Sequence, residues 1–383
     1  MKKQSEYHGF ELGPIRPPSE SQSLLLRVTR NCPWNRCRFC GLYKGEKFEL
    51  RSAEHIMRDI DRVAYFTEAL ERAMEEQGSR YAAVKSLSAD LDAPDRMALF
   101  MADGWMRGGR ESVFLQDANS LIMKPAELAK VLGYLKRRFP QVERVTSYAR
   151  SQTVSAMKDE DMAMLREAGL TRVHIGMESG CDAVLELVKK GVDKKRHIEA
   201  GLRVKRAGIE LSEYYMPGLG GRKYMRDNAL ETADVVSRVN PDFVRLRTLA
   251  VPEYLELYKD VAEGRFEKCT DVETAQEILL FLENLRGCTG VIRSDHILNL
   301  FQEIDGKLPD DLDKMKQPII RFSAMNAREQ LLYIAGRRAG VFQKLSDMDN
   351  AYLREHAEAT VKNHGVTQDN LQEFSDSMMN RFI

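Results

Sequence analysis

The chain has no excess charge of either sign: its 383 residues include 58 Lys and Arg and 58 Asp and Glu, a formal net charge of zero. This balance disfavours a broad basic face, so we do not expect nucleic acid as a partner. No stretch of about 18 apolar residues occurs, which argues against a membrane span. The N-terminal residues are polar and lack the apolar core of a signal peptide. We therefore predict a cytoplasmic protein without a membrane partner.

Cysteine is scarce, with six residues in 383. A secreted disulfide scaffold would be shorter and denser in cysteine. Three of the six, Cys32, Cys37 and Cys40, fall within nine residues and form a candidate metal site. The others are scattered, and we expect them to be buried as small hydrophobic residues. These scattered cysteines are Cys181, Cys269 and Cys288.

Short apolar segments alternate with helical patterns between residues 24 and 250. Strands are expected over residues 24–29, 112–117, 142–148, 172–177, 210–216 and 242–249. Helices are expected over residues 52–76, 125–139, 159–168, 182–190, 194–207 and 226–239, with a helical insertion over about 52–110. Strands separated by helices indicate βα units and a parallel sheet. Because six units fall short of the eight of a closed TIM barrel, we predict an α/β fold with a partial (β/α)6 TIM-like barrel.

Two further regions flank this predicted barrel. Residues 1–23 are rich in Pro, Glu and Ser and are expected to form an N-terminal arm, and residues 251–383 to form a mostly helical C-terminal domain. Helices in that last domain are expected over residues 274–285, 295–303, 312–321, 327–337 and from 350 to the end.

The three clustered cysteines have the spacing C-x4-C-x2-C. A structural zinc site normally needs four ligands, and His55 or a remote cysteine would have to supply the fourth. Three thiolates suit a [4Fe–4S] cluster with one open iron, and an open position is typical of a catalytic metal site. The loop follows the first predicted strand, at the carboxyl end of the sheet, where active sites of barrel folds lie.

These features resemble the radical SAM superfamily, whose loop after the first strand most often reads C-x3-C-x2-C. The first spacing is one residue longer here, and Phe39 is the aromatic residue before the last cysteine. The resemblance covers roughly residues 24–250 and looks closest to the branch of coproporphyrinogen dehydrogenase and elongator-type proteins. It implies that Cys32, Cys37 and Cys40 bind three irons of a [4Fe–4S] cluster, and that the fourth iron binds S-adenosylmethionine (SAM).

The resemblance also implies contacts to SAM at the predicted strand ends. The implied contact residues are Phe39, Gln116, Asp117, Asn119, Ser147, Arg150, Glu178 and Lys190. Arg150 could pair with the SAM carboxylate. Lys190 follows Glu178 by 12 residues, where relatives have an arginine, and lysine lacks the planar fork of a guanidinium. As alternatives, Asp117 and Glu178 could cap helices, Lys190 could be solvated, and Arg150 could pair with a surface carboxylate.

Four residues are candidates for the substrate site: Tyr214, Arg245, Arg247 and His296. Tyr214 and Tyr215 should point to opposite faces of their strand, and we expect Tyr214 to face the interior. Arg245 and Arg247 share a face; they would bind an acidic substrate if that face is interior, and otherwise cover the exterior. His296 either faces the active site or is structural, and Ser294 or Asp295 is expected to be a helix N-cap rather than part of a hydrolytic triad.

The resemblance implies reductive cleavage of SAM to a 5′-deoxyadenosyl radical, which abstracts hydrogen from an unidentified substrate. We expect a small molecule as this substrate. Radical modification of tRNA or of a protein is the first alternative, and a non-enzymatic metal-binding module is the second. The cluster would need an electron donor of the flavodoxin or ferredoxin type.

Overall fold

The computed structural model describes residues 6–382, which form two compact units that interleave along the chain. The first unit holds the chain up to Asn35, Gly45–Ile175 and Arg203–Leu211; the second holds Arg36–Lys44, Gly176–Leu202 and the chain from Ser212. The division follows spatial contacts rather than the sequence, and the boundaries expected near residues 24 and 251 stay predictions. Strands β6 and β7 and helix α8 have residues in both units.

The first unit is built on parallel strands. They are β1 (Leu24–Arg27), β4 (Ser112–Gln116), β5 (Arg144–Ala149) and β6 (Arg172–Glu178), paired in the register Leu24↔Val113, Ser112↔Arg144 and Thr146↔Arg172. β2 (Thr29–Arg30) and β3 (Glu49–Leu50) pair antiparallel on either side of the segment that carries the clustered cysteines. Every residue of β4 is buried, which explains its continuous apolar sequence.

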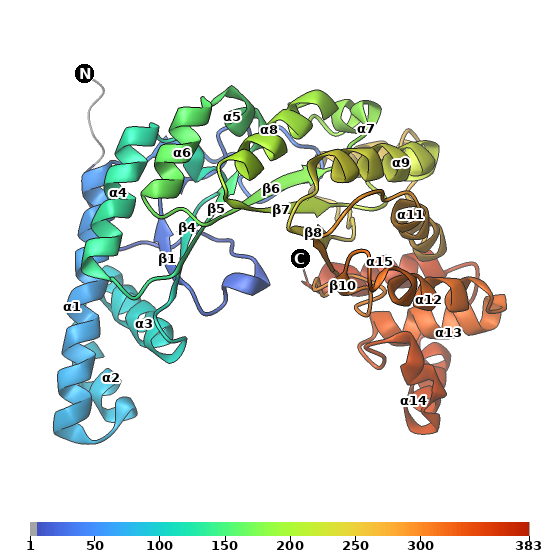
Figure 1. Cartoon of the computed structure of the whole chain (residues 1–383). Helices are drawn as coiled ribbons and strands as arrows, with labels where there is room; N and C mark the ends of the chain where they lie inside the picture. The colour runs from blue at the N-terminus through green and yellow to red at the C-terminus, as the bar shows by residue number, and fades with distance from the viewer. Residues whose placement is uncertain (1–5, 383) are drawn as a thin grey trace. The chain divides into compact units, whose positions relative to one another are not determined.

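Helices cover these strands. They are α1 (Ala53–Gln77), α2 (Arg80–Ser88), α3 (Ala93–Arg107), α4 (Pro125–Arg138), α5 (Ser151–Ala156) and α6 (Asp159–Glu167), with 3-10 turns η1 (Pro18–Glu20) and η2 (Ser120–Ile122). α1 packs against α2, α3 and α4 (Figure 1). The Ser52 hydroxyl accepts a 3.2 Å hydrogen bond from the His55 N–H, and Gly78 ends α1 with a φ of 63°. The expected helical insertion is therefore formed by α1, α2 and α3.

The second unit combines a shorter set of strands with most of the C-terminal helices. Its strands are β7 (Glu210–Tyr215), β8 (Phe243–Leu246), β9 (Val291–Arg293) and β10 (Gly306–Lys307). Its helices are α7 (Asp182–Leu187), α8 (Lys194–Arg206), α9 (Gly221–Val239), α10 (Glu256–Ala262), α11 (Asp271–Glu283), α12 (Leu312–Ser323), α13 (Ala327–Arg338), α14 (Ala351–Asn363) and α15 (Leu371–Met379), with η3 (Leu345–Asp349) and η4 (Asn380–Phe382). β7, β8 and β9 are parallel, whereas β10 is antiparallel to β9.

The strand order is β1-β4-β5-β6-β7-β8-β9-β10, so the parallel strands follow one another in chain order. This is the connectivity of a TIM-like barrel rather than of a doubly wound sheet, in which the order reverses at a switch point. The predicted α/β fold is confirmed. The sheet is longer than the six predicted strands, because β9 and β10 come from the part of the chain that was expected to be helical.

Several predicted helices need correction. Residues 295–303 form a loop and not a helix. The Asp295 side chain pairs with Arg245 of β8, and the Asn299 side chain donates to the Leu246 carbonyl of β8, instead of capping a first turn. α9 begins at Gly221, five residues earlier than predicted. The helix expected from residue 350 to the end is interrupted after α14, where Gly365 has a φ of 59°.

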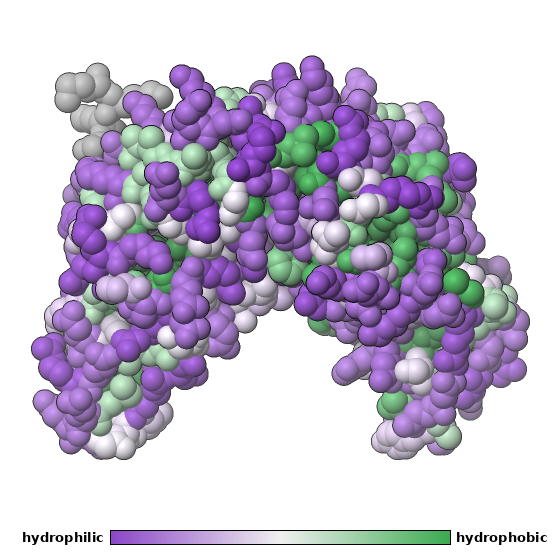
Figure 2. All heavy atoms as spheres, in the orientation of Figure 1, coloured by the Kyte–Doolittle hydropathy of each residue, from purple (hydrophilic) through white to green (hydrophobic). Residues whose placement is uncertain are grey.

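Hydrophilic side chains cover most of the surface seen in Figure 2. Over residues 6–382, no helix is both long and apolar enough to cross a membrane.

Candidate functional site

Arg38 holds the segment between Cys37 and Cys40 in place within the second unit. The Arg38 N–H donates to the Val188 carbonyl over 3.0 Å, and the Arg38 carbonyl accepts from the Leu257 N–H over 3.0 Å. Its guanidinium pairs with Asp260 of α10. The position of this segment is thus set by the chain just after α7 and by α10.

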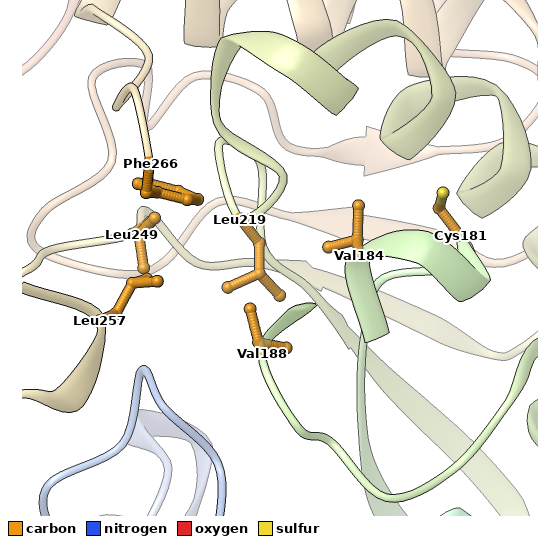
Figure 3. Packing of buried hydrophobic residues seen from close by; sticks show 7 residues of the cluster. All are labelled: Cys181, Val184, Val188, Leu219, Leu249, Leu257 and Phe266. Atoms are coloured by element: carbon orange, nitrogen blue, oxygen red, sulfur yellow. The ribbon is translucent and has the colours of Figure 1, made fainter. Parts of the chain in front are cut away.

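A buried apolar cluster supports the same segment. We call it the loop-anchor cluster; its members are Cys181, Val184, Val188, Leu219, Leu249, Leu257 and Phe266 (Figure 3). Phe39 is partly buried and packs against it. The Nζ atom of Lys190 lies 5.6 Å from the centroid of the Phe39 ring, within the range of a cation–π interaction. The aromatic residue between the last two cysteines therefore packs against an apolar cluster and lies near a cation.

All six cysteines are free thiols, and they divide as predicted into two classes. Cys32, Cys37 and Cys40 are partly exposed, whereas the three scattered cysteines are buried. Burial raises the pKa of the Cys269 thiol to about 12, which disfavours the thiolate that a metal requires. The clustered cysteines are therefore the better metal donors.

This donor set can be tested against the implied iron–sulfur cluster. Among the described residues, no three His, Cys, Asp or Glu side chains meet closely enough to hold a single metal ion. A [4Fe–4S] cluster makes a different demand, because each thiolate binds its own iron. Three soft, partly exposed sulfur donors within nine residues fit such a cluster.

Glu178 and Lys190 form an ion pair, with 3.1 Å between Lys190 Nζ and Glu178 Oε1. Their side chains are only 13% and 12% exposed, so Lys190 is paired rather than solvated, and Glu178 caps no helix. Glu178 has a φ of 65° at the end of β6. Gly176 leaves room for the pair, because a Cβ atom there would lie 2.3 Å from Glu178 Oε1. The structure thus brings together the two residues that the sequence separates by 12 positions.

A buried carboxylate, Glu277 of α11, fixes the turn that follows β7. Its Oε1 atom accepts hydrogen bonds from the Tyr215 hydroxyl (2.8 Å) and from Asn228 Nδ2 (2.7 Å), and Oε2 accepts from the Gly218 N–H (2.9 Å). The Ser179 hydroxyl donates to Asn228 Oδ1 over 2.5 Å. Glu277 gives no functional signal in the sequence, because a single glutamate in an amphipathic helix has the pattern of a solvated residue.

Burial raises the pKa of Glu277 from 4.5 to about 7. The folded pKa lies above the unfolded one, so Glu277 loses its proton in the unfolded state first. The unfolding free energy therefore falls as the pH rises from about 4.5 through 7. We expect Glu277→Gln to remove this effect, so that the unfolding free energy of the wild type, relative to the variant, falls by about 2 kcal/mol from pH 5 to pH 8. Urea unfolding at several pH values measures it.

Glu273→Gln is the matched control for this pH experiment, because Glu273 lies on the same helix. Burial would raise the pKa of Glu273, but the Thr270 backbone and Arg222 hold it below its usual value. A lowered folded pKa places its contribution to the pH dependence mainly below pH 5, so the variant should keep nearly the wild-type slope between pH 5 and 8. Equal slopes for wild type and Glu277→Gln would contradict the prediction.

Gln116 and Asp117, at the end of β4, are almost fully buried and bond to other parts of the chain. The Gln116 side chain accepts from the Gly13 N–H over 2.9 Å and donates to the Ile15 carbonyl over 2.7 Å. Asp117 does not cap a helix but pairs with Arg27 over 3.0 Å. The N-terminal arm therefore binds the residues expected to contact SAM; that contact stays a prediction.

Asn119 and Arg150 connect the ends of β4 and β5. Asn119 is fully buried and accepts from the Arg150 backbone N–H over 3.0 Å. The Arg150 guanidinium lies 5.1 Å from the centroid of Trp34, which is between Cys32 and Cys37 in the sequence. Ser147 is fully buried, and its hydroxyl donates to the Tyr148 carbonyl. Arg150 thus contacts the segment that carries the clustered cysteines.

The substrate-site candidates gather in the second unit. Tyr214 is paired in register with Arg245, and the Arg247 guanidinium lies 4.7 Å from the Tyr214 ring centroid. Tyr215 points instead to Glu277. Asp295 binds both arginines and is not the N-cap that the sequence suggested. His296 follows it on the same loop.

Comparison with known proteins gives one family match. The model of the radical SAM superfamily matches residues 85–233, from within α2 to within α9. The curated tRNA uridine(34) acetyltransferases of Methanocaldococcus infernus and Methanocaldococcus jannaschii are each 26% identical, over 129 and 132 residues, covering 33% of this chain. The chain spans about a quarter of the length of these curated relatives, 24% in each case.

Solved structures with some similarity include the Elp3 protein of Methanocaldococcus infernus lacking N-terminal residues 1–46, at 16% identity and a TM-score of 0.40, covering 51% of this chain and 52% of that one. Coproporphyrinogen III oxidase (HemN) from Escherichia coli, described as a radical SAM enzyme, has 14% identity and a TM-score of 0.42, covering 68% and 52%.

Proposed function

Because the chain is a member of the radical SAM superfamily, we propose that it abstracts hydrogen from a small, acidic molecule. Superfamily membership makes it an enzyme whose cofactors are a [4Fe–4S] cluster and SAM. The substrate and the roles of single residues are our proposal. We also propose the cytoplasm as its location and a flavodoxin or ferredoxin as its electron donor.

Cys32, Cys37 and Cys40 would hold the cluster, since they are the partly exposed soft donors. When bound, the cluster and SAM supply a 5′-deoxyadenosyl radical by one-electron reductive cleavage. The chain's own residues then orient and shield the reacting groups. The loop-anchor cluster holds Phe39, and the Glu178–Lys190 pair offers one charge of each sign to a ligand that carries both an amino and a carboxylate group.

We propose a small substrate because the two arginines at the carboxyl end of β8 are largely buried. The side chains of Arg245 and Arg247 are 5% and 14% exposed. Contacts to nucleic-acid phosphates are normally made by exposed basic side chains spread over a face. A small molecule can enter and bind at buried guanidinium groups, and ligand sites in parallel sheets lie at the carboxyl ends of strands.

Modification of tRNA is the second candidate function. It is favoured by the two curated relatives, which are named as tRNA uridine(34) acetyltransferases. The similarity covers a third of this chain, so it bears on the shared segment and not on the activity of the whole relative.

The proposal is tested by anaerobic reconstitution with iron and sulfide, followed by SAM and dithionite. Mass spectrometry then quantifies 5′-deoxyadenosine in three samples: protein alone, protein with the low-molecular-weight fraction of a cell extract, and protein with purified bulk tRNA. We expect the low-molecular-weight fraction to accelerate formation. Acceleration by tRNA alone would favour the second candidate. No 5′-deoxyadenosine in any sample, despite bound cluster and SAM, would overturn the proposed reaction.

A further inference from the structure

We propose that Arg245 and Arg247 form the recognition site for an anionic group of the substrate, a carboxylate or a phosphate, and that Asp295 is an internal anion that competes for it. This inference rests on the proposed function, because it identifies the chemical class that the same site selects. It assigns to Asp295 a role in setting substrate affinity.

The backbone places the three charges together. Arg245 and Arg247 are two residues apart at the end of β8 and therefore project from one face of the strand. Asp295 follows β9, whose Arg293 is paired in register with Arg245. Asp295 divides its two oxygens between the arginines: Oδ2 binds Arg245 Nη1, and Oδ1 lies 3.0 Å from Arg247 Nη1.

The charges in this group do not balance. Two guanidinium groups share one carboxylate, and the neighbouring Arg293 has its own partner in Asp305. Burial alone would raise the pKa of Asp295, but the two arginines hold it below its usual value, so this carboxylate is charged. One positive charge is left over on two guanidinium groups that are 5% and 14% exposed, and a charge so far removed from water is costly without a counter-ion. A substrate anion would supply the missing charge.

Unused hydrogen-bond donors point to the same conclusion. Arg245 is 4% exposed, and among the described residues its buried Nε atom has no hydrogen-bond partner. The buried Nδ1 atom of His296, which donates or accepts according to the tautomer, likewise has no partner within residues 6–382. Unsatisfied buried donors are rare in folded proteins, and each costs about 1–3 kcal/mol. A ligand that accepts hydrogen bonds would satisfy them.

Two neighbouring side chains prepare the site without adding negative charge. The Tyr214 ring centroid lies 4.7 Å from the Cζ atom of Arg247, within the range of a cation–π interaction. Burial and the nearby Arg247 lower the pKa of His296 to about 4, so its imidazole is neutral at physiological pH. A neutral imidazole can donate one hydrogen bond to an anion while its second nitrogen accepts another.

The test measures anion binding rather than turnover. Thermal unfolding of the reconstituted protein is followed in sodium phosphate, sodium succinate and sodium chloride at equal ionic strength. A bound anion raises Tm with concentration, which yields its Kd. The variants are Asp295→Asn and Arg247→Gln, with Arg293→Gln as the matched control at an exposed arginine of the same region. Phosphate and succinate distinguish the two anion classes.

We expect phosphate or succinate to stabilise the wild type and Arg293→Gln alike, beyond the general salt effect seen in chloride. Arg247→Gln should weaken this binding at least about tenfold, the loss expected for a hydrogen bond to a charged group. Asp295→Asn should unfold at a lower Tm in chloride, regain stability when the anion is added, and bind it at least about tenfold more tightly.

Equal anion dependence in the wild type and Arg247→Gln would overturn the proposal. This comparison decides the question even if Asp295→Asn does not fold. If Asp295→Asn folds but binds the anions no more tightly than the wild type, the role of Asp295 is refuted. Anion binding by a wild type that forms no 5′-deoxyadenosine would keep the anion site while overturning the proposed reaction, so the two failures are distinguishable.

Discussion

Cys37→Ala is expected to contain little iron after reconstitution and to form no detectable 5′-deoxyadenosine from SAM and dithionite. The reason is that Cys37 is one of only three clustered thiols, and a [4Fe–4S] cluster that loses one of three protein ligands is not retained. Iron analysis, visible absorption and mass spectrometry of 5′-deoxyadenosine measure the three consequences on one sample.

Cys288→Ala is the matched control. Cys288 is buried, and burial raises its pKa, so it has neither the access nor the ionisation of a metal ligand. The variant should keep wild-type iron content and 5′-deoxyadenosine formation. Wild-type iron in Cys37→Ala would contradict the ligand assignment. A colourless, zinc-containing wild type would favour the non-enzymatic metal module instead.

Local signals in the sequence were sufficient to predict much of the secondary structure of the first unit. The helix expected over residues 52–76 matches α1 because its ends are set locally: Ser52 caps its first turn and Gly78 ends it. The cysteine spacing was also a local signal. The buried Cys269 and Cys288 could be expected because isolated cysteines commonly pack as small hydrophobic residues.

The parts that were missed depend on long-range contacts. β9 has three residues, too few to show an alternating pattern, and it exists because β8 offers it an edge. Asp295 has the sequence features of a helix cap, yet two arginines from β8 determine its position. The bonds from Gln116 to Gly13 and Ile15 join residues about 100 positions apart, which no local pattern reveals.

Arg51→Met is expected to lower the unfolding free energy by about 3–5 kcal/mol, the usual cost of removing one partner of a buried ion pair. The Arg51 side chain is fully buried; its Nη1 atom lies 2.5 Å from Asp59, also fully buried, and its Nε atom lies 2.8 Å from Glu11. Nη1 also donates to the Arg27 carbonyl over 2.7 Å. The substitution leaves the Asp59 carboxylate buried without its cation. Urea unfolding at pH 7 measures the loss.

Arg107→Met provides the matched surface change, because Arg107 is 64% exposed and pairs with Asp103 one helical turn away. Its loss should cost less than about 1 kcal/mol.

The double variant Arg51→Met/Asp59→Asn should be more stable than Arg51→Met alone, since it removes the unpaired charge. Burial raises the pKa of Asp59 to about 6 even with Arg51 present. Without Arg51 that pKa rises further, so lowering the pH from 7 to 5 should recover part of the loss by protonating Asp59. Equal losses in Arg51→Met and Arg107→Met would show that this network does not hold the N-terminal arm to β1 and α1.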